Sequence, residues 1–258
     1  MTVPNTSGFS GPLWERIYRD FADVPSVGDG FRTGDWMASS NRRLDAIKGA
    51  GCRYQEYLLP AIAAVIATER GKDPLVVLDV GCGPGNGYPP LRAAMPSGGI
   101  DFHVVENEQV CSLGRAAFPS TTELTFHTSI PRLSDIDIVH LGSVIQYVND
   151  WKSFVKEATD LQSEYLLFSD AFAGHVPTFI TAQNFYGMKL PCRFLSLDEL
   201  VGFVSEQGMH LVLDTEYDRT MLGKRDPLPL DALPEQYRLR YTHHLLFRRI
   251  ARRINKGS

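Results

Sequence analysis

The chain has 258 residues, with a hydrophobic fraction of 43%, a charged fraction of 22% and a formal net charge of −4. These values are ordinary for a globular protein; they exclude the basic surface of a nucleic-acid binder, and no apolar run is long enough for stable membrane insertion. The cysteines, Cys52, Cys82, Cys111 and Cys192, form no C-x-x-C pair, which indicates reduced thiols in a cytoplasm and no metal site.

The first part of the chain is predicted to be a helical cap or extension over residues 1–70. Residues 12–23 carry apolar side chains at helical spacing and indicate a short helix. Residues 24–36 are rich in glycine and are typical of a loop. Residues 41–70 indicate two helical pieces, since small and glycine residues near position 50 and Pro60 would each interrupt a helix.

From residue 75 onward, short apolar segments alternate with helical stretches such as 151–160 and 197–207. This alternation predicts βαβ units and a mainly parallel sheet. The seven predicted strands are 75–80, 101–105, 124–127, 136–141, 164–169, 209–214 and 243–248. We therefore expect residues 71–258 to form an α/β domain, with helices on both faces of a seven-stranded sheet.

The first predicted strand leads into a glycine-rich loop. The apolar run Val76–Val80 is interrupted only by Asp79, and Gly81, Gly83 and Gly85 follow it. Glycines let the backbone turn sharply and approach a ligand closely, because no Cβ intervenes. A helix after the loop would offer N–H groups to a carboxylate or a phosphate. We interpret the loop as a ligand cradle; a site for another nucleotide and a purely structural turn are the alternatives.

The order Asp-x-Gly-x-Gly-x-Gly resembles motif I of the Rossmann-like S-adenosylmethionine (SAM) methyltransferases. Dinucleotide enzymes use G-x-G-x-x-G beside a pyrophosphate instead. The resemblance implies a methyltransferase whose seventh strand is inserted antiparallel, with SAM as cofactor and S-adenosylhomocysteine (SAH) as product. It also implies that Asp79 orients the loop and that Cys82 fills space there rather than acting as a nucleophile.

Further candidate cofactor contacts stand at the ends of predicted strands. Glu106 ends the second strand, and its two carboxylate oxygens could accept both ribose hydroxyls; a surface glutamate at the start of a helix is the alternative. Residues 127–129 end the third strand, where methyltransferases usually contact adenine. The predicted cofactor-binding residues are Asp79, Gly81, Cys82, Gly83, Gly85, Tyr88, Glu106, Asn107, Thr128 and Ser143.

The methyl acceptor is expected beside the fourth and fifth predicted strands. Gln146 and Tyr147 follow the fourth strand, and the carboxyl ends of parallel strands line the ligand crevice. Segment 170–192 is long for a loop between a strand and a helix, so we expect an acceptor-binding insertion there. The candidate catalytic residues are Asp170, His175 and Tyr147, and the candidate substrate-binding residues are Gln146, Gln183 and Tyr186. A surface position for His175 and a packing role for Tyr147 are the alternatives.

A narrower resemblance is to a little-characterised bacterial methyltransferase family associated with surface-polysaccharide genes. The residues that carry it are Trp14, Tyr18, Tyr88, Gly114, Ile145–Tyr147, Gln183, Pro191–Cys192 and Leu245–Arg248. It implies methylation of a small molecule or a glycan, preferentially at oxygen, with residues 1–70 and 170–192 closing over the acceptor. Two other functions stay open: a non-catalytic SAM-binding scaffold, and a nicotinamide-dependent oxidoreductase, which the glycine spacing disfavours. The sequence leaves the acceptor and the oligomeric state undetermined.

Overall fold

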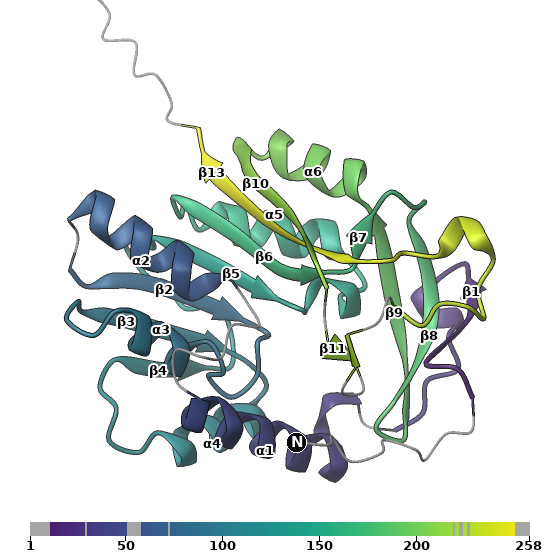
Figure 1. Ribbon diagram of the computed structural model, residues 1–258, viewed down its shortest axis with the longest axis horizontal. Coiled ribbons are helices and arrows are strands. Elements are labelled where there is room, and N and C mark those ends of the chain that lie inside the picture. The colour runs from purple at the N-terminus through teal and green to yellow at the C-terminus, as the bar shows by residue number, and fades with distance from the viewer. Residues whose placement is uncertain are drawn as a thin grey trace, which may run out of the picture.

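The fold is built on three sheets, of which the central one has seven strands (Figure 1). The computed structural model of the protein describes residues 11–28, 30–50, 58–71, 73–218, 220–221, 224–225 and 228–250. Cys52 lies outside these residues, and Cys82, Cys111 and Cys192 are buried thiols. In the described part of the chain, no helix combines the length and the apolar character needed to cross a membrane.

The central sheet contains all seven strands that the sequence predicts. Side by side, they are β10 (Met209–Tyr217), β13 (Thr242–Arg249), β6 (Tyr165–Ala171), β5 (Ile138–Gly142), β2 (Leu75–Val80), β3 (Ile100–Val105) and β4 (Leu124–His127). The pairs from β6 to β4 are parallel, whereas β13 is antiparallel to both β6 and β10. The expected mainly parallel sheet with an inserted antiparallel strand is therefore confirmed.

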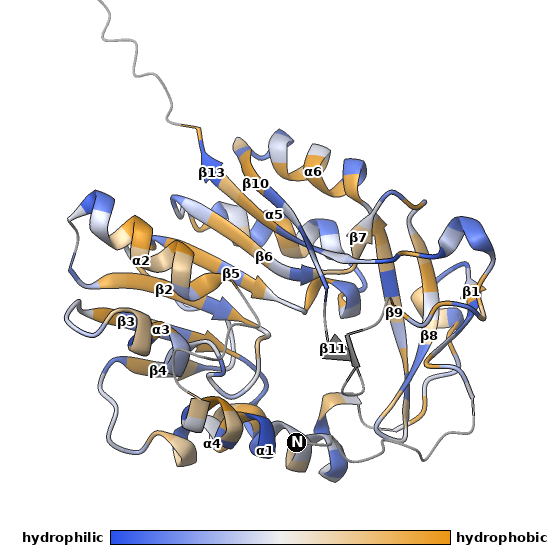
Figure 2. Ribbon diagram, in the orientation of Figure 1, coloured by the Kyte–Doolittle hydropathy of each residue, from blue (hydrophilic) through white to orange (hydrophobic). Residues whose placement is uncertain are grey.

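Helices cover both faces of the central sheet, as predicted. The described α-helices are α1 (Gly34–Ala50), α2 (Leu59–Arg70), α3 (Tyr88–Ala94), α4 (Glu108–Ala117), α5 (Trp151–Asp160) and α6 (Leu197–Glu206), of which α2 and α3 pack on one face and α5 and α6 on the other. Alternate strand residues face opposite sides: Val77 packs with α2 and α3, and Leu78 packs with α5 and α6. Figure 2 shows the hydrophobic residues concentrated along β2, β5 and β6.

The helices of the first part differ in detail from the prediction. The helix α1 already begins at Gly34, so the end of the predicted loop 24–36 is helical, after a short 3-10 turn, η2 (Gly30–Arg32). Pro60 lies in the first turn of α2, where a proline is tolerated because its missing N–H has no intrahelical partner. The proline therefore starts this helix instead of interrupting it.

A second sheet joins the beginning of the chain to the segment after β6 (Figure 1). Its strands are, in order, β1 (Trp14–Tyr18), β8 (Phe179–Phe185), β9 (Met188–Ser196) and β7 (Ala173–Gly174). The helix predicted over 12–23 is therefore wrong: β1 pairs antiparallel with β8, and only Phe21–Asp23 form a 3-10 turn, η1. Pairing with a distant strand overrides the local helical spacing.

The segment 170–192 is not a long loop, because it contains β7, β8 and the residues of β9 before position 193; its acceptor-binding role stays a prediction. The strands β8 and β9 form a hairpin whose two turn residues, Tyr186 and Gly187, have φ of 49° and 72°. Two consecutive residues with positive φ are typical of the tight turns that match the twist of a hairpin. The sequence did carry a signal, since a Tyr-Gly pair lies between two apolar runs, and a short glycine-containing loop between such runs indicates a hairpin.

Shorter elements complete the described fold. The turn η4 (Ile145–Tyr147) follows β5, and η5 (Glu235–Tyr237) precedes β13. The strands β11 (Thr220–Met221) and β12 (Lys224–Arg225) form a two-stranded sheet between β10 and η5. Of these elements, η4 matters most for function, because it places two predicted site residues directly after a central parallel strand.

Candidate functional site

The glycine loop leaves the carboxyl end of β2 along a path that requires glycine. Gly81, Gly83 and Gly85 have φ of 74°, 90° and 86°, a region that other residues rarely adopt. A Cβ on Gly81 would lie 2.3 Å from Val144 Cγ2, and one on Gly83 would lie 2.8 Å from Asn86 Nδ2. The loop is therefore held by its own backbone geometry and by close neighbours, and a side chain at either position would displace it.

Glu106, directly after β3, is tied to this loop. Its Oε1 accepts a hydrogen bond from the backbone N–H of Gly83 at 3.0 Å, and its Oε2 accepts one from the backbone N–H of Asn107 at 3.1 Å. Burial raises the pKa of Glu106, the two backbone hydrogen bonds oppose that shift, and the charge of Asp79 adds to it. Because each carboxylate oxygen can accept a second hydrogen bond, the group can still receive two hydroxyl donors.

A buried chain of polar side chains lies below the loop. His140 Nδ1 is 2.8 Å from Asp79 Oδ1, and His140 Nε2 is 2.8 Å from Ser169 Oγ. All three residues are fully buried. His140 and Ser169 were not among the predicted site residues, although a histidine within the apolar strand Ile138–Gly142 is the kind of buried polar residue that signals a specific contact.

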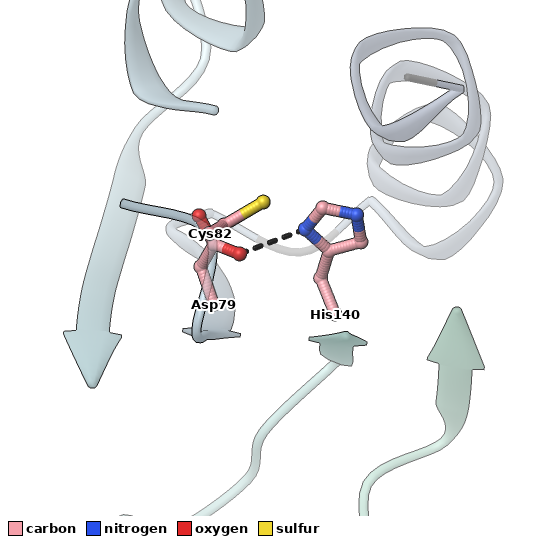
Figure 3. Close-up of side chains that lie close together, drawn as sticks. All are labelled: Asp79, Cys82 and His140. Carbon is pink, nitrogen blue, oxygen red and sulfur yellow. Dashed lines mark hydrogen bonds and ion pairs between the residues drawn. The ribbon is translucent and has the colours of Figure 1, made fainter. Parts of the chain in front are cut away.

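Cys82 lies beside this chain, and Figure 3 shows its thiol next to the imidazole of His140. The donor atoms of Asp79, Cys82 and His140 all lie within 4.8 Å of one another, as a metal site would require. However, Asp79 and His140 already hydrogen-bond to each other, and His140 also bonds to Ser169. A metal ion would have to replace these contacts, so we interpret the cluster as hydrogen-bonded.

Asp170, near the carboxyl end of β6, the strand next to β5, forms the second part of the site. Its Oδ1 accepts a hydrogen bond from Thr242 Oγ1 at 2.7 Å, and its Oδ2 accepts one from Ser143 Oγ at 2.9 Å. Asp170 and Ser143 both have a φ of 54°, which is uncommon for residues other than glycine. Such strained positions persist where the surroundings fix them, and they cluster at functional sites. Thr242 comes from the distant strand β13, and no local motif indicated its place in the site.

The direction of these hydrogen bonds fixes the amide orientation of Gln146. An ionised Asp170 can only accept, so the hydroxyl of Ser143 donates to it and, in turn, accepts from Gln146 Nε2 at 3.0 Å. Gln146 Oε1 is then left without a hydrogen-bond partner among the described residues, although the residue is fully buried. A buried acceptor of this kind is costly unless a water or a ligand donates to it.

Tyr147 connects η4 to the second sheet. Its hydroxyl donates a hydrogen bond to Gln183 Oε1 at 2.8 Å, and its ring packs edge-on against Phe31 with the centroids 4.8 Å apart. Gln146, Tyr147 and Gln183, which were predicted as substrate or catalytic residues from separate segments, therefore lie together beside Asp170. Hydrogen bonds connect Gln146 to Asp170 through Ser143, and Tyr147 to Gln183 in β8.

Two other predicted acceptor residues lie elsewhere in the second sheet. His175 is exposed and directly follows β7, whose residues pair with Leu195 and Ser196 at the far end of β9. Tyr186 lies in the β8–β9 turn, where its hydroxyl is 2.6 Å from Ser39 Oγ of α1. Trp14 is fully buried against Phe172 and Phe194, so it belongs to a hydrophobic core.

The remaining predicted cofactor residues surround the glycine loop. The Tyr88 hydroxyl donates to Glu123 Oε2 at 2.8 Å, and burial, with help from that glutamate, raises the pKa of Tyr88 to about 12. Asn107 caps α4, because its side chain accepts hydrogen bonds from the backbone of Gln109 and Val110. Thr128 is exposed just after β4. The cofactor role of each residue stays a prediction.

Comparison with known proteins identifies the fold. No protein-family model matches the chain, and no curated protein matches it in sequence. Solved structures do match. One is the 1,6-didemethyltoxoflavin-N1-methyltransferase of Burkholderia thailandensis, with bound 1,6-didemethyltoxoflavin and SAH. It has 15% identity and a TM-score of 0.52, and the match covers 91% of this chain and 99% of that one.

Two further structures agree with it. A methyltransferase of Haloferax volcanii in complex with an activator protein has 15% identity and a TM-score of 0.52, with 83% and 95% of the two chains covered. A protein of Listeria monocytogenes assigned as a SAM-dependent methyltransferase has 13% identity and a TM-score of 0.50, with 74% and 99% covered. Identities this low show the fold alone. The chain therefore has the α/β, Rossmann-like fold of these SAM-dependent methyltransferases.

Proposed function

We propose that the protein is a SAM-dependent methyltransferase that acts on a small molecule or a glycan. The observation that carries this proposal is the hydrogen bond between Gly83 and Glu106, which joins the glycine loop to an acidic residue at the end of the adjacent strand. This arrangement lies at the carboxyl edge of a parallel sheet, where open α/β sheets bind their ligands. The fold shared with methyltransferases supports the same reading.

The residues around the loop fit the cofactor. Gly81 and Gly83 carry no Cβ, so a ligand can approach the backbone of the loop closely. Glu106 would accept the ribose hydroxyls, while Thr128, Asn107 and Ser143 would contact other parts of the cofactor. When bound, SAM supplies an electrophilic methyl group on a sulfonium. Alignment of the acceptor with that group supplies much of the catalysis in such a displacement.

On the acceptor side, we assign Asp170 the role of proton acceptor. An acceptor hydroxyl would give its proton to Ser143 Oγ while the proton of Ser143 passes to Asp170 Oδ2, over the hydrogen bond of 2.9 Å. One O–H bond is broken on the acceptor and one is formed on Asp170. His175 is a weaker candidate, because it is exposed on a segment that pairs with the far end of β9.

Gln146, Tyr147 and Gln183 would orient the acceptor. Gln146 is fully buried and would act through Ser143, whose hydroxyl accepts a hydrogen bond from Gln146 Nε2 at 3.0 Å. Tyr186, held by Ser39 at the β8–β9 turn, would contact a more distant part of it. We also propose that the methyl group goes to an oxygen and that the protein is cytoplasmic. Membership of the polysaccharide-associated family is part of the same proposal.

Binding followed by turnover tests the proposal against its alternatives. We expect SAM and SAH to raise the melting temperature of the full chain in a concentration-dependent way, and NAD to leave it unchanged. Mass spectrometry of nucleotide sugars, glycans and small metabolites incubated with the protein and SAM should then show one product heavier by a methyl group. Stabilisation by NAD alone would indicate an oxidoreductase, and SAH binding without any methylated product would favour a scaffold.

A further inference from the structure

The chain Asp79–His140–Ser169 crosses three neighbouring strands below the glycine loop. We infer that His140 is a positioning residue, which holds Asp79 and thereby fixes the loop that receives the cofactor. This inference rests on the proposed function, since the loop has to bind SAM for its position to matter.

The register of the central sheet brings the three side chains into line. Asp79 in β2 pairs directly with His140 in β5, and Gly142 pairs with Ser169 in β6. The side chains share one face of the sheet, because Asp79 and His140 alternate with residues of the opposite core. Asp79 lies two residues before Gly81, so the hydrogen bond that holds its carboxylate also restrains the backbone where the loop begins.

A second contact couples the loop to β5. Ideal geometry places a Cβ on Gly142 only 2.1 Å from Cys82 Sγ and 2.9 Å from His140 Cε1. The absence of a side chain at position 142 therefore makes room for both the thiol and the imidazole, as Figure 3 indicates for Cys82 and His140. The loop is packed onto the same ring that holds Asp79.

The chain also continues toward the acceptor side. The backbone N–H of Ser143 donates to the carbonyl oxygen of Ser169 at 2.8 Å, and the hydroxyl of Ser143 donates to Asp170. His140 therefore lies between Asp79, which precedes the cofactor loop, and the pair Ser143 and Asp170, which is proposed to accept the proton. Its imidazole connects the cofactor side of the site to the acceptor side.

Burial excludes a direct chemical role for this chain. Serine, histidine and aspartate in this order resemble the triad of serine hydrolases, in which the serine attacks the substrate. Here Ser169, His140 and Asp79 are all fully buried, so no substrate reaches the hydroxyl. The resemblance extends only to orientation: Asp79 would accept a hydrogen bond from Nδ1–H of His140, and Ser169 holds the other edge of the ring at Nε2.

The test compares Ser169→Ala, His140→Asn and His140→Phe with the full wild-type chain, using SAH as the probe in isothermal titration calorimetry. Ser163→Ala is the matched control, because Ser163 is equally buried but donates to the carbonyl of Tyr165, outside the site. Loss of one hydrogen bond should weaken SAH binding about threefold to tenfold in Ser169→Ala. The asparagine variant keeps a donor toward Asp79, so it should bind SAH more tightly than the phenylalanine variant does.

Nitrogen-15 NMR of the histidine side chains adds a readout that loss of stability alone would not change. We expect Nδ1 of His140 to carry the proton in the wild-type protein and to keep it in Ser163→Ala. If Ser169→Ala and His140→Phe are folded and bind SAH within twofold of wild type, or if Nδ1 carries no proton, the inference is overturned. A wild-type protein that does not bind SAH would instead overturn the proposed function, and this role of His140 with it.

Discussion

The backbone N–H of Gly83 donates a hydrogen bond to Glu106 Oε1 at 3.0 Å, which joins the loop after β2 to the end of β3. The two residues are separated by 22 others in the chain, yet they form one surface at the carboxyl edge of the sheet. A carboxylate already oriented by two backbone donors loses little freedom when it accepts hydroxyls from a ligand. This relationship makes Glu106 the first residue to test.

Replacement of Glu106 by alanine should weaken SAH binding. The variant loses hydrogen bonds to a charged group worth roughly 1.5–3 kcal/mol, so the dissociation constant should rise about tenfold to a hundredfold. Calorimetric titration measures it, with Glu108→Ala as the control, since the Glu108 side chain is 66% exposed in the first turn of α4. An affinity of Glu106→Ala within twofold of wild type would refute the ribose role.

Glu106 should also make stability depend on pH. Burial raises its folded-state pKa, so in the window from about pH 4.5 up to that raised pKa the folded state binds more protons than the unfolded state. The stabilising contribution is therefore fully present below about pH 4.5 and is lost as the pH rises through the folded pKa. Urea unfolding across this range should show that the free energy of unfolding of wild type falls relative to that of Glu106→Gln as the pH rises. A difference between the two proteins that does not change with pH would contradict this prediction.

Substitution of Gly83 by valine should abolish SAH binding in a folded protein. The residue has a φ of 90°, and its Cβ would lie 2.8 Å from Asn86 Nδ2, so the loop must leave its path. Gly202→Val is the matched control, because a Cβ there meets no atom within 4 Å. We would measure both variants by calorimetry after checking their circular dichroism. Unchanged affinity in Gly83→Val would exclude the loop as the cofactor site.

Changes at Asp170 should stop turnover while SAH still binds. Removal of a general base lowers the rate by roughly 10²–10⁴-fold, so Asp170→Asn should turn over the methylated substrate at least about a hundredfold more slowly. Ser143→Ala should show a similar loss, because it removes the hydroxyl between the acceptor and Asp170. Asp160→Asn, at an exposed position, serves as the control. Wild-type turnover by Asp170→Asn would remove it from the mechanism.

Trp14 should be essential for stability rather than for ligand contact. It is fully buried and packs edge-on against Phe172 and Phe194, so Trp14→Ala should cost about 3–5 kcal/mol of unfolding free energy. Trp36→Ala, at a half-buried position on α1, should cost less. Urea denaturation measures both. Equal losses would show that the core of the second sheet does not depend on β1.

Local patterns in the sequence were enough to predict the central sheet. Its strands contain short apolar runs bounded by turn or helix residues, so the signal for each strand lies within the strand's own residues. The glycine loop was equally predictable, because the positive φ values of Gly81, Gly83 and Gly85 are a local demand of the backbone. Glu106 was predicted as a site residue because it stands at the end of a predicted strand.

The second sheet and the polar chain depend on contacts between distant residues, and only the tertiary structure decided them. Trp14 becomes part of a strand because it pairs with Gln183, and the pattern of apolar residues around position 14 carries no information about that distant partner. His140 acquires its role from Asp79 and Ser169, which the register of three strands places beside it. The sequence by itself determined the elements with local signals, whereas long-range pairing and burial determined which polar side chains meet.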